Sequence, residues 1–146
     1  MTMYIIHAVV LVSILLWLCY TDWRTQIIPD FVHILLIVYA LIVLPIDYLD
    51  SLTGFLVGFM LMFIVSMFGP TGGGDIKLMG SLGTWFSWQI IDVFLLSYIV
   101  GLIYVGFFYI KSRDSKQEVP FGPAIAIAAF LIYFTEVSLL YKEVFT

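Results

Sequence analysis

The sequence predicts an all-α, polytopic membrane protein with six transmembrane helices, the fourth of them short. Composition is the first reason: 63% of the 146 residues are hydrophobic and only 11% are charged, too few to cover a water-facing surface. The second is that the apolar residues gather in runs near the roughly 20 residues that cross a bilayer. We therefore expect residues 1–146 to form a single domain embedded in the lipid bilayer.

Five of the apolar runs are long enough to span a membrane. The first, Met3–Tyr20, contains no charged residue and lacks a basic segment and a small-residue cleavage site, so we expect a retained helix rather than a signal peptide. The other four long helices are expected at Phe31–Tyr48, Leu52–Phe68, Gln89–Ile110 and Phe121–Tyr141.

The segment Ile76–Trp88 is apolar but short, since about 13 residues of helix extend only about 20 Å. If it crosses, one side of the membrane receives most of the basic residues, and the other side, with both termini, holds only Lys142. If it does not cross, this bias disappears. The positive-inside rule therefore favours six crossings, with both termini outside the cytoplasm. The cytoplasmic basic residues are then Arg24, Lys77, Lys111, Arg113 and Lys116.

Other features narrow the classes of function. No basic run suggests nucleic-acid binding, and the formal charge of -4 is too small to steer a partner. Cys19 is the only cysteine, which excludes an internal disulfide and a cysteine-based zinc site. His7 and His33 fall near opposite ends of the membrane, so we expect no metal, and no cofactor motif is present.

Two carboxylates at membrane depth are the leading candidates for catalytic residues, because placing an ionisable group there costs free energy. Asp22 follows the first helix and Asp75 begins the fourth, and the topology above puts both on the cytoplasmic side. Two carboxyl groups held close together share one proton, so one of them activates water while the other hydrogen-bonds to a peptide carbonyl. This pair predicts an aspartic protease.

The glycines before Asp75 favour the same interpretation. Gly72, Gly73 and Gly74 permit positive φ angles and close approach of another backbone. A flexible connection between helices explains them equally well. A phosphate-binding loop does not, because the spacing to Lys77 differs from that motif and no Ser or Thr follows the lysine.

Three motifs in this order resemble those of the type IV prepilin peptidases, which are G-x-G-D membrane aspartic proteases. Asp22–Asp30, with its Ile-Pro-Asp ending, resembles their first aspartate motif, and Gly72–Leu78 resembles their G-x-G-D followed by Lys-Leu. Pro120–Pro123 resembles the Pro-Phe-Gly-Pro that opens their last helix. The resemblance covers about residues 15–135.

The resemblance implies a membrane endopeptidase with Asp22 and Asp75 as its catalytic residues. Its substrates would be prepilin or pseudopilin precursors, cleaved after a short cytoplasmic leader, and its location the cytoplasmic membrane with the active site facing the cytoplasm. Other motif positions would bind substrate or support the loops, with the last four forming one wall of the substrate groove. These positions are Pro29, Asp30, Gly72, Gly74, Lys77, Pro120, Phe121, Gly122 and Pro123.

The chain departs from the larger members of that family at one point. They carry a cytoplasmic insertion with paired cysteines and also N-methylate the new terminus, whereas a nine-residue connection without a CxxC motif follows the first helix here. The chain therefore resembles the minimal form, and we expect cleavage without methylation.

Two alternatives remain open at this stage. A different G-x-G-D protease would cut inside other transmembrane helices, although Pro-Phe-Gly-Pro in place of Pro-Ala-Leu argues against it. A small transporter or a non-catalytic secretion-apparatus assembly protein would use the aspartates to bind an ion. Among the remaining residues, we expect His33 to be hydrogen-bonded within the bundle, Trp85 and Trp88 to lie at the far interface, and four glycines to serve helix packing. These glycines are Gly54, Gly58, Gly101 and Gly106.

Overall fold

The computed structural model describes residues 2–69, 71–112 and 120–145, and every regular element in these ranges is a helix. The predicted all-α class is therefore confirmed for the described part of the chain. The elements in order are α1 (Thr2–Thr25), α2 (Asp30–Val43), α3 (Tyr48–Ser66), α4 (Gly73–Phe86), the short 3-10 helix η1 (Ser87–Gln89), α5 (Ile90–Ser112) and α6 (Gly122–Phe145).

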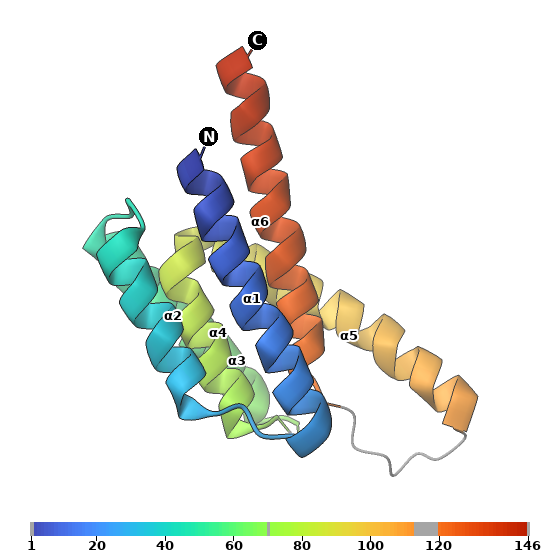
Figure 1. The fold of residues 1–146 in the computed structure, drawn as a ribbon. Coiled ribbons are helices and arrows are strands. Elements are labelled where there is room, and N and C mark those ends of the chain that lie inside the picture. Colours follow the sequence, from blue (N-terminus) through green and yellow to red (C-terminus); the bar gives the residue numbers. More distant parts are fainter. Residues whose placement is uncertain (1, 70, 113–119, 146) are drawn as a thin grey trace.

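Successive helices run in alternating directions (Figure 1). Both ends of the chain lie at the top of the view, while the α1–α2 and α3–α4 connections lie together at the bottom. α5 leans away from the other helices along its second half. The Asp22–Asp30 and Gly72–Leu78 motifs thus meet at one end of the bundle. Residues 113–119, with Arg113 and Lys116, lie outside the described residues.

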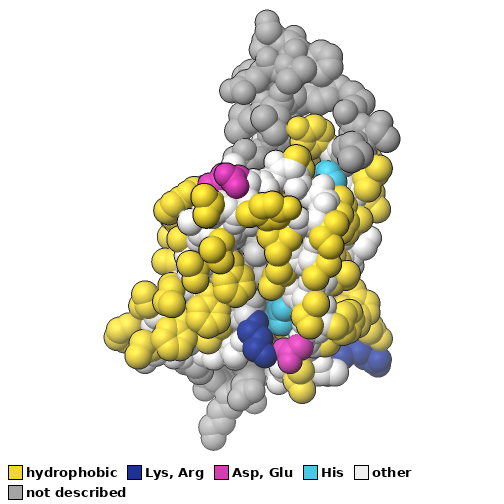
Figure 2. Space-filling model, turned by 90° about the vertical axis from the view of Figure 1, so that its left-hand side faces the viewer, with side chains coloured by type: hydrophobic (Ala, Val, Ile, Leu, Met, Phe, Trp, Pro, Cys, Tyr) yellow, Lys and Arg dark blue, Asp and Glu magenta, His cyan; other side chains and the backbone are white. Residues whose placement is uncertain are grey.

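Three helical segments are long and apolar enough to cross a membrane, namely Tyr4–Thr25, Tyr48–Ser66 and the stretch Gly73–Phe107. α2 and the segment Gly122–Thr135 of α6 are apolar but shorter. Large hydrophobic side chains cover much of the surface, and Figure 2 shows them across one face with charged groups near its upper and lower edges. Such a surface suits lipid rather than water.

The largest differences from the expected helix boundaries are at the ends of α1 and α2. α1 continues to Thr25 instead of ending at Tyr20. α2 ends at Val43, because Leu44 takes the extended conformation (φ -78°, ψ 139°) that the residue before a proline prefers, and Pro45 follows it. Because α1 is longer than expected, the candidate catalytic residue Asp22 lies within the helix and not after it.

α4 is short because it lies inside the bundle: all its residues from Leu78 to Phe86 are buried. Its partner is α3, and the two backbones touch. A Cβ atom at Gly54 would overlap the carbonyl oxygen of Gly83, and one at Gly58 would overlap that of Met79. The packing role expected of Gly54 and Gly58 is therefore confirmed, and it follows the small-residue pattern of membrane helix pairs.

α2 packs on the other side of α4 through buried polar contacts. His33 Nδ1 and Ser81 Oγ lie 3.3 Å apart in a hydrogen bond, as expected of a bundle histidine. The Trp85 indole donates a 2.8 Å hydrogen bond to the Leu36 carbonyl and stacks on the Tyr39 ring. These contacts bury Trp85 inside the bundle, whereas its neighbour in η1, Trp88, is exposed. The location of both at the far interface stays a prediction.

Candidate active site

Asp22 is buried in the last turns of α1, with only 5% of its surface exposed. Its Oδ2 accepts a hydrogen bond of 3.0 Å from the backbone N–H of Gly122, the first residue of α6. The first N–H groups of a helix lack partners within that helix, so they are suited to hold a carboxylate. This bond joins residues 100 positions apart and holds one oxygen of the Asp22 carboxyl group.

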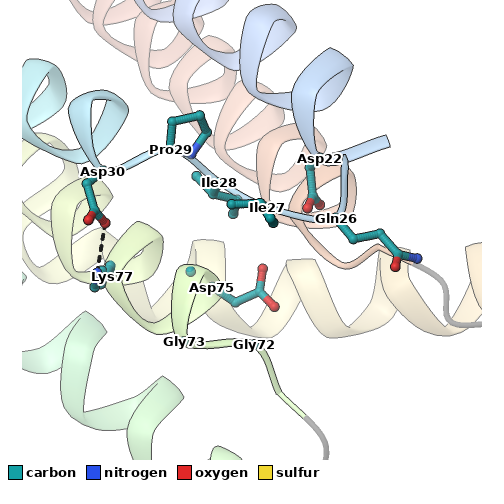
Figure 3. Close-up of a pocket in the computed structure, with 11 residues that line it drawn as sticks. Asp22, Gln26, Ile27, Ile28, Pro29, Asp30, Gly72, Gly73, Asp75 and Lys77 are labelled. Atoms are coloured by element: carbon teal, nitrogen blue, oxygen red, sulfur yellow. Dashed lines mark hydrogen bonds and ion pairs between the residues drawn. The ribbon is translucent and has the colours of Figure 1, made fainter. Parts of the chain in front are cut away.

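Asp75 lies in the first turn of α4 and is 9% exposed. Its backbone N–H donates a 3.1 Å hydrogen bond to the carbonyl of Gly72, the residue that caps the helix. The helix start thus fixes the backbone of Asp75, and the side chain extends from the first turn of α4 toward α1 (Figure 3).

Two of the three glycines before Asp75, Gly72 and Gly74, lie where a side chain would crowd a neighbour. None has a positive φ angle, so the conformational freedom expected from the sequence is not used. A Cβ atom at Gly74 would lie 3.3 Å from the Ile28 side chain, and one at Gly72 would lie 3.3 Å from Asp75 Oδ2. Gly74 therefore lets the α1–α2 connection approach, while Gly72 leaves room beside the carboxyl group.

The two aspartates share a cavity of about 430 Å³ at the end of the bundle opposite the termini. In Figure 3 both carboxyl groups project into the space between α1 and the start of α4. They are near enough for the charge on Asp22 to act on Asp75. The lining consists of Asp22, Gln26, Ile27, Ile28, Pro29, Asp30, Gly72, Gly73, Gly74, Asp75 and Lys77.

An ion pair stands at the rim of this cavity. Lys77 Nζ lies 2.7 Å from Asp30 Oδ1, and the two side chains are 55% and 74% exposed. The pair links the first residue of α2 to the second turn of α4 (Figure 3). The pair joins the start of α2 to α4 while both charges stay exposed.

The α1–α2 connection supplies cavity residues that the sequence motifs did not single out. Gln26, Ile27 and Ile28 line the cavity, and Gln26 has a positive φ of 53° where the chain leaves α1. Pro29 follows with extended backbone and caps α2. All of them lie inside the Asp22–Asp30 motif, so the motif was the available signal, but their direction toward the cavity depends on the turn at Gln26.

The segment Pro120–Pro123 is not part of the cavity lining. Its Gly122 instead donates the hydrogen bond to Asp22 that is described above. The Phe121 ring packs against Tyr98 of α5, with ring centroids 5.2 Å apart. In this structure the stretch therefore contacts a candidate catalytic residue without lining the cavity.

The comparisons with known proteins point to one family. The family model described as "Type IV leader peptidase family" matches residues 9–106, more than half of the chain but short of the Pro120–Pro123 stretch. No solved structure matches.

Curated relatives carry one name, prepilin leader peptidase/N-methyltransferase. The Bacillus subtilis protein is 31% identical over 134 residues, covering 86% of this chain and 54% of the relative. The Legionella pneumophila protein is 28% identical over 147 residues, covering 91% of this chain and 51% of the relative. A protein of Aeromonas salmonicida is 40% identical over 62 residues, which is 41% of this chain and 21% of the relative.

The chain thus spans about half the length, or less, of these relatives. Only four residues, Gln26–Pro29, separate α1 from α2, which agrees with the minimal form expected from the sequence. The matched family model and the shared motifs lead to one conclusion: the chain belongs to the type IV leader peptidase family.

Proposed function

We propose that this chain is a membrane aspartic endopeptidase that removes the leader peptide from type IV prepilins or pseudopilins. The observation that carries the proposal is a pair of buried carboxyl groups, Asp22 of α1 and Asp75 of α4, facing one cavity. Membership of the leader peptidase family and the printed names of the relatives support the substrate class.

The pair has the components that peptide hydrolysis needs. Two neighbouring carboxyl groups share one proton, because both cannot ionise at short distance. The ionised one takes a proton from water, whose oxygen then attacks the scissile carbonyl, while the protonated one hydrogen-bonds to the carbonyl oxygen. When the carbon–nitrogen bond breaks, the leaving amine takes up the proton that water gave. Gly122 donates a hydrogen bond to Oδ2 of Asp22 and so holds this carboxyl group in position for the exchange.

The cavity geometry fits a chain segment entering from the cytoplasmic end. Ile27 and Ile28 give it an apolar side, and the rim pair of Asp30 and Lys77 gives it charged groups. We propose that Asp30, Lys77 and the glycines contact or orient the substrate backbone. The apolar helix of the precursor would pack against the bundle from the lipid and bring the scissile bond to the interface.

We further propose six membrane crossings, including α2 and α4, with the cavity facing the cytoplasm. The alternating direction of the helices and the position of Arg24 and Lys77 near the cavity end support this orientation. The burial of α4 accounts for its small length, since a helix inside a bundle need not match the full thickness of the bilayer.

The direct experiment is cleavage of a type IV prepilin precursor, with its leader intact, by the purified chain in detergent. We expect Asp22→Asn and Asp75→Asn each to lower kcat by about 10²–10⁴-fold, the usual contribution of acid–base catalysis. Asp50→Asn is the matched control, because Asp50 is an exposed aspartate in the first turn of α3 at the opposite end of the bundle.

Product mass identifies the cleaved bond and separates the proposal from ion transport. Release of the leader by the wild-type chain, lost in both Asn variants and kept in the control, supports the proposal. Full cleavage by either variant refutes the catalytic pair. A wild-type chain that binds the precursor without releasing a leader refutes the peptidase activity.

A further inference from the structure

The carboxyl group of Asp22 is held by a hydrogen bond from Gly122, a residue that does not line the cavity. Gly122 is buried, and a Cβ atom there would overlap Asp22 Oδ2, so the lack of a side chain lets the N–H of this residue approach the carboxyl group as it does here. The position of that N–H is set by the start of α6, where Phe121 accepts backbone hydrogen bonds from Ala124 (3.0 Å) and Ile125 (3.2 Å). Phe121 and Gly122 therefore move with the first turn of α6.

The Phe121 ring is held in turn by α5. It packs against the Tyr98 ring and lies directly over Gly101, where an added Cβ would come within 2.6 Å of Phe121 Cε2. Gly101 is buried, so the ring occupies the space that a side chain would take. A continuous series of contacts runs from α5 through Phe121 and Gly122 to the carboxyl group of Asp22.

We propose that Gly101 and Phe121 are positioning residues for peptide cleavage, acting on Asp22 through the backbone N–H of Gly122. The proposal rests on the proposed catalytic role of Asp22. Neither residue lines the cavity, so neither is expected to contact the substrate. Their loss should therefore lower kcat and leave KM nearly unchanged.

The first test is Gly101→Ala, which forces the Phe121 ring to move by several tenths of an ångström or more. Small displacements of a catalytic group reduce rates strongly, about 100-fold for 1 Å. We expect kcat for a type IV prepilin precursor to fall by about tenfold or more, with KM within about twofold. The matched control is Gly106→Ala, on the same helix, where an added Cβ meets no atom of the described residues within 4 Å.

The second test is rescue by a smaller side chain. Phe121→Leu removes Cε2, the atom that a Cβ at Gly101 would meet, and keeps atoms near Cδ2, which lies at an ordinary 3.4 Å. We expect the double variant Gly101→Ala/Phe121→Leu to regain part of the kcat that Gly101→Ala loses. General damage to the fold would instead lower the activity of the double variant further.

An unchanged kcat in Gly101→Ala, or a loss that appears in KM, would overturn the proposal. If Gly101→Ala does not accumulate in the membrane, Phe121→Leu alone decides: a lower kcat at constant KM supports positioning, and an unchanged kcat contradicts it. Asp22→Asn separates this inference from the proposed function. Activity in that variant removes the catalytic role of Asp22, whereas an inactive Asp22→Asn beside a fully active Gly101→Ala removes only the positioning role.

Discussion

At the scale of single residues, the ion pair between Asp30 and Lys77 raises the question of what an exposed salt bridge contributes. Both side chains are more than half exposed, so solvent screening and lost side-chain freedom offset most of their attraction. The pair is therefore a weak source of stability. Its location at the rim of the cavity favours a role in binding the substrate.

We predict that Lys77→Met raises KM for a prepilin precursor several-fold, leaves kcat within about twofold, and hardly changes the melting temperature. The reason is that Lys77 pairs with Asp30 at the rim of the cavity and not with the proposed catalytic residues Asp22 and Asp75. The charge-swapped variant Asp30→Lys/Lys77→Asp tests the alternative of loop support. Full recovery of KM in the swap would mean that the pair only holds the connection to α4.

Residues also differ in how well the sequence identified them. Asp22 and Asp75 were recognisable because a carboxyl group at membrane depth is costly and each ends or begins an apolar run. Gly122 was noticed only as part of a motif. Its hydrogen bond to Asp22 spans 100 residues, and no local pattern predicts which helix start meets which side chain.

At the scale of elements, α4 shows how a helix too short for a bilayer is stabilised within a bundle. The sequence predicted Ile76–Trp88 and the structure has Gly73–Phe86, so the element was found and its ends shifted by two or three residues. The glycines Gly54 and Gly83 bring α3 and α4 into backbone contact. This contact fixes the position of α4 along α3, and with it the position of Asp75 in the bundle.

We predict that Gly54→Ala destabilises the protein by about 1–3 kcal/mol, because overpacking a close backbone contact forces the two helices apart. Gly69→Ala is the matched control, since Gly69 lies just after α3 and a Cβ there meets no atom within 4 Å. Thermal unfolding in detergent measures both. Equal melting temperatures for the two variants would contradict the close α3–α4 packing.

At the scale of the whole molecule, orientation in the membrane decides which compartment the cavity faces. The termini lie at one end of the bundle and the cavity at the other (Figures 1 and 3). The charge bias that led to this orientation includes Lys111, Arg113 and Lys116, and the last two lie outside the described residues. Within the described residues, the proposed orientation rests on Arg24 and Lys77.

We predict the accessibility of single cysteines introduced into a Cys19→Ser background. A membrane-impermeant maleimide should label Asp50→Cys and Trp88→Cys in intact spheroplasts, and Thr25→Cys and Gly69→Cys only after permeabilisation. These pairs lie at opposite ends of the bundle. Labelling of all four positions from the same side would exclude the proposed six crossings, and the reverse pattern would invert the orientation.

The sequence by itself determined the all-α class, the apolar surface and the two aspartate motifs, because composition, run length and local spacing are properties of neighbouring residues. Only the tertiary structure decided that α1 carries Asp22 to the start of α6, that glycines act by size rather than by positive φ, and that Phe121 lies over Gly101. Such contacts join residues far apart in the chain. They depend on how helices pack, and packing is fixed by the shapes of all the side chains together.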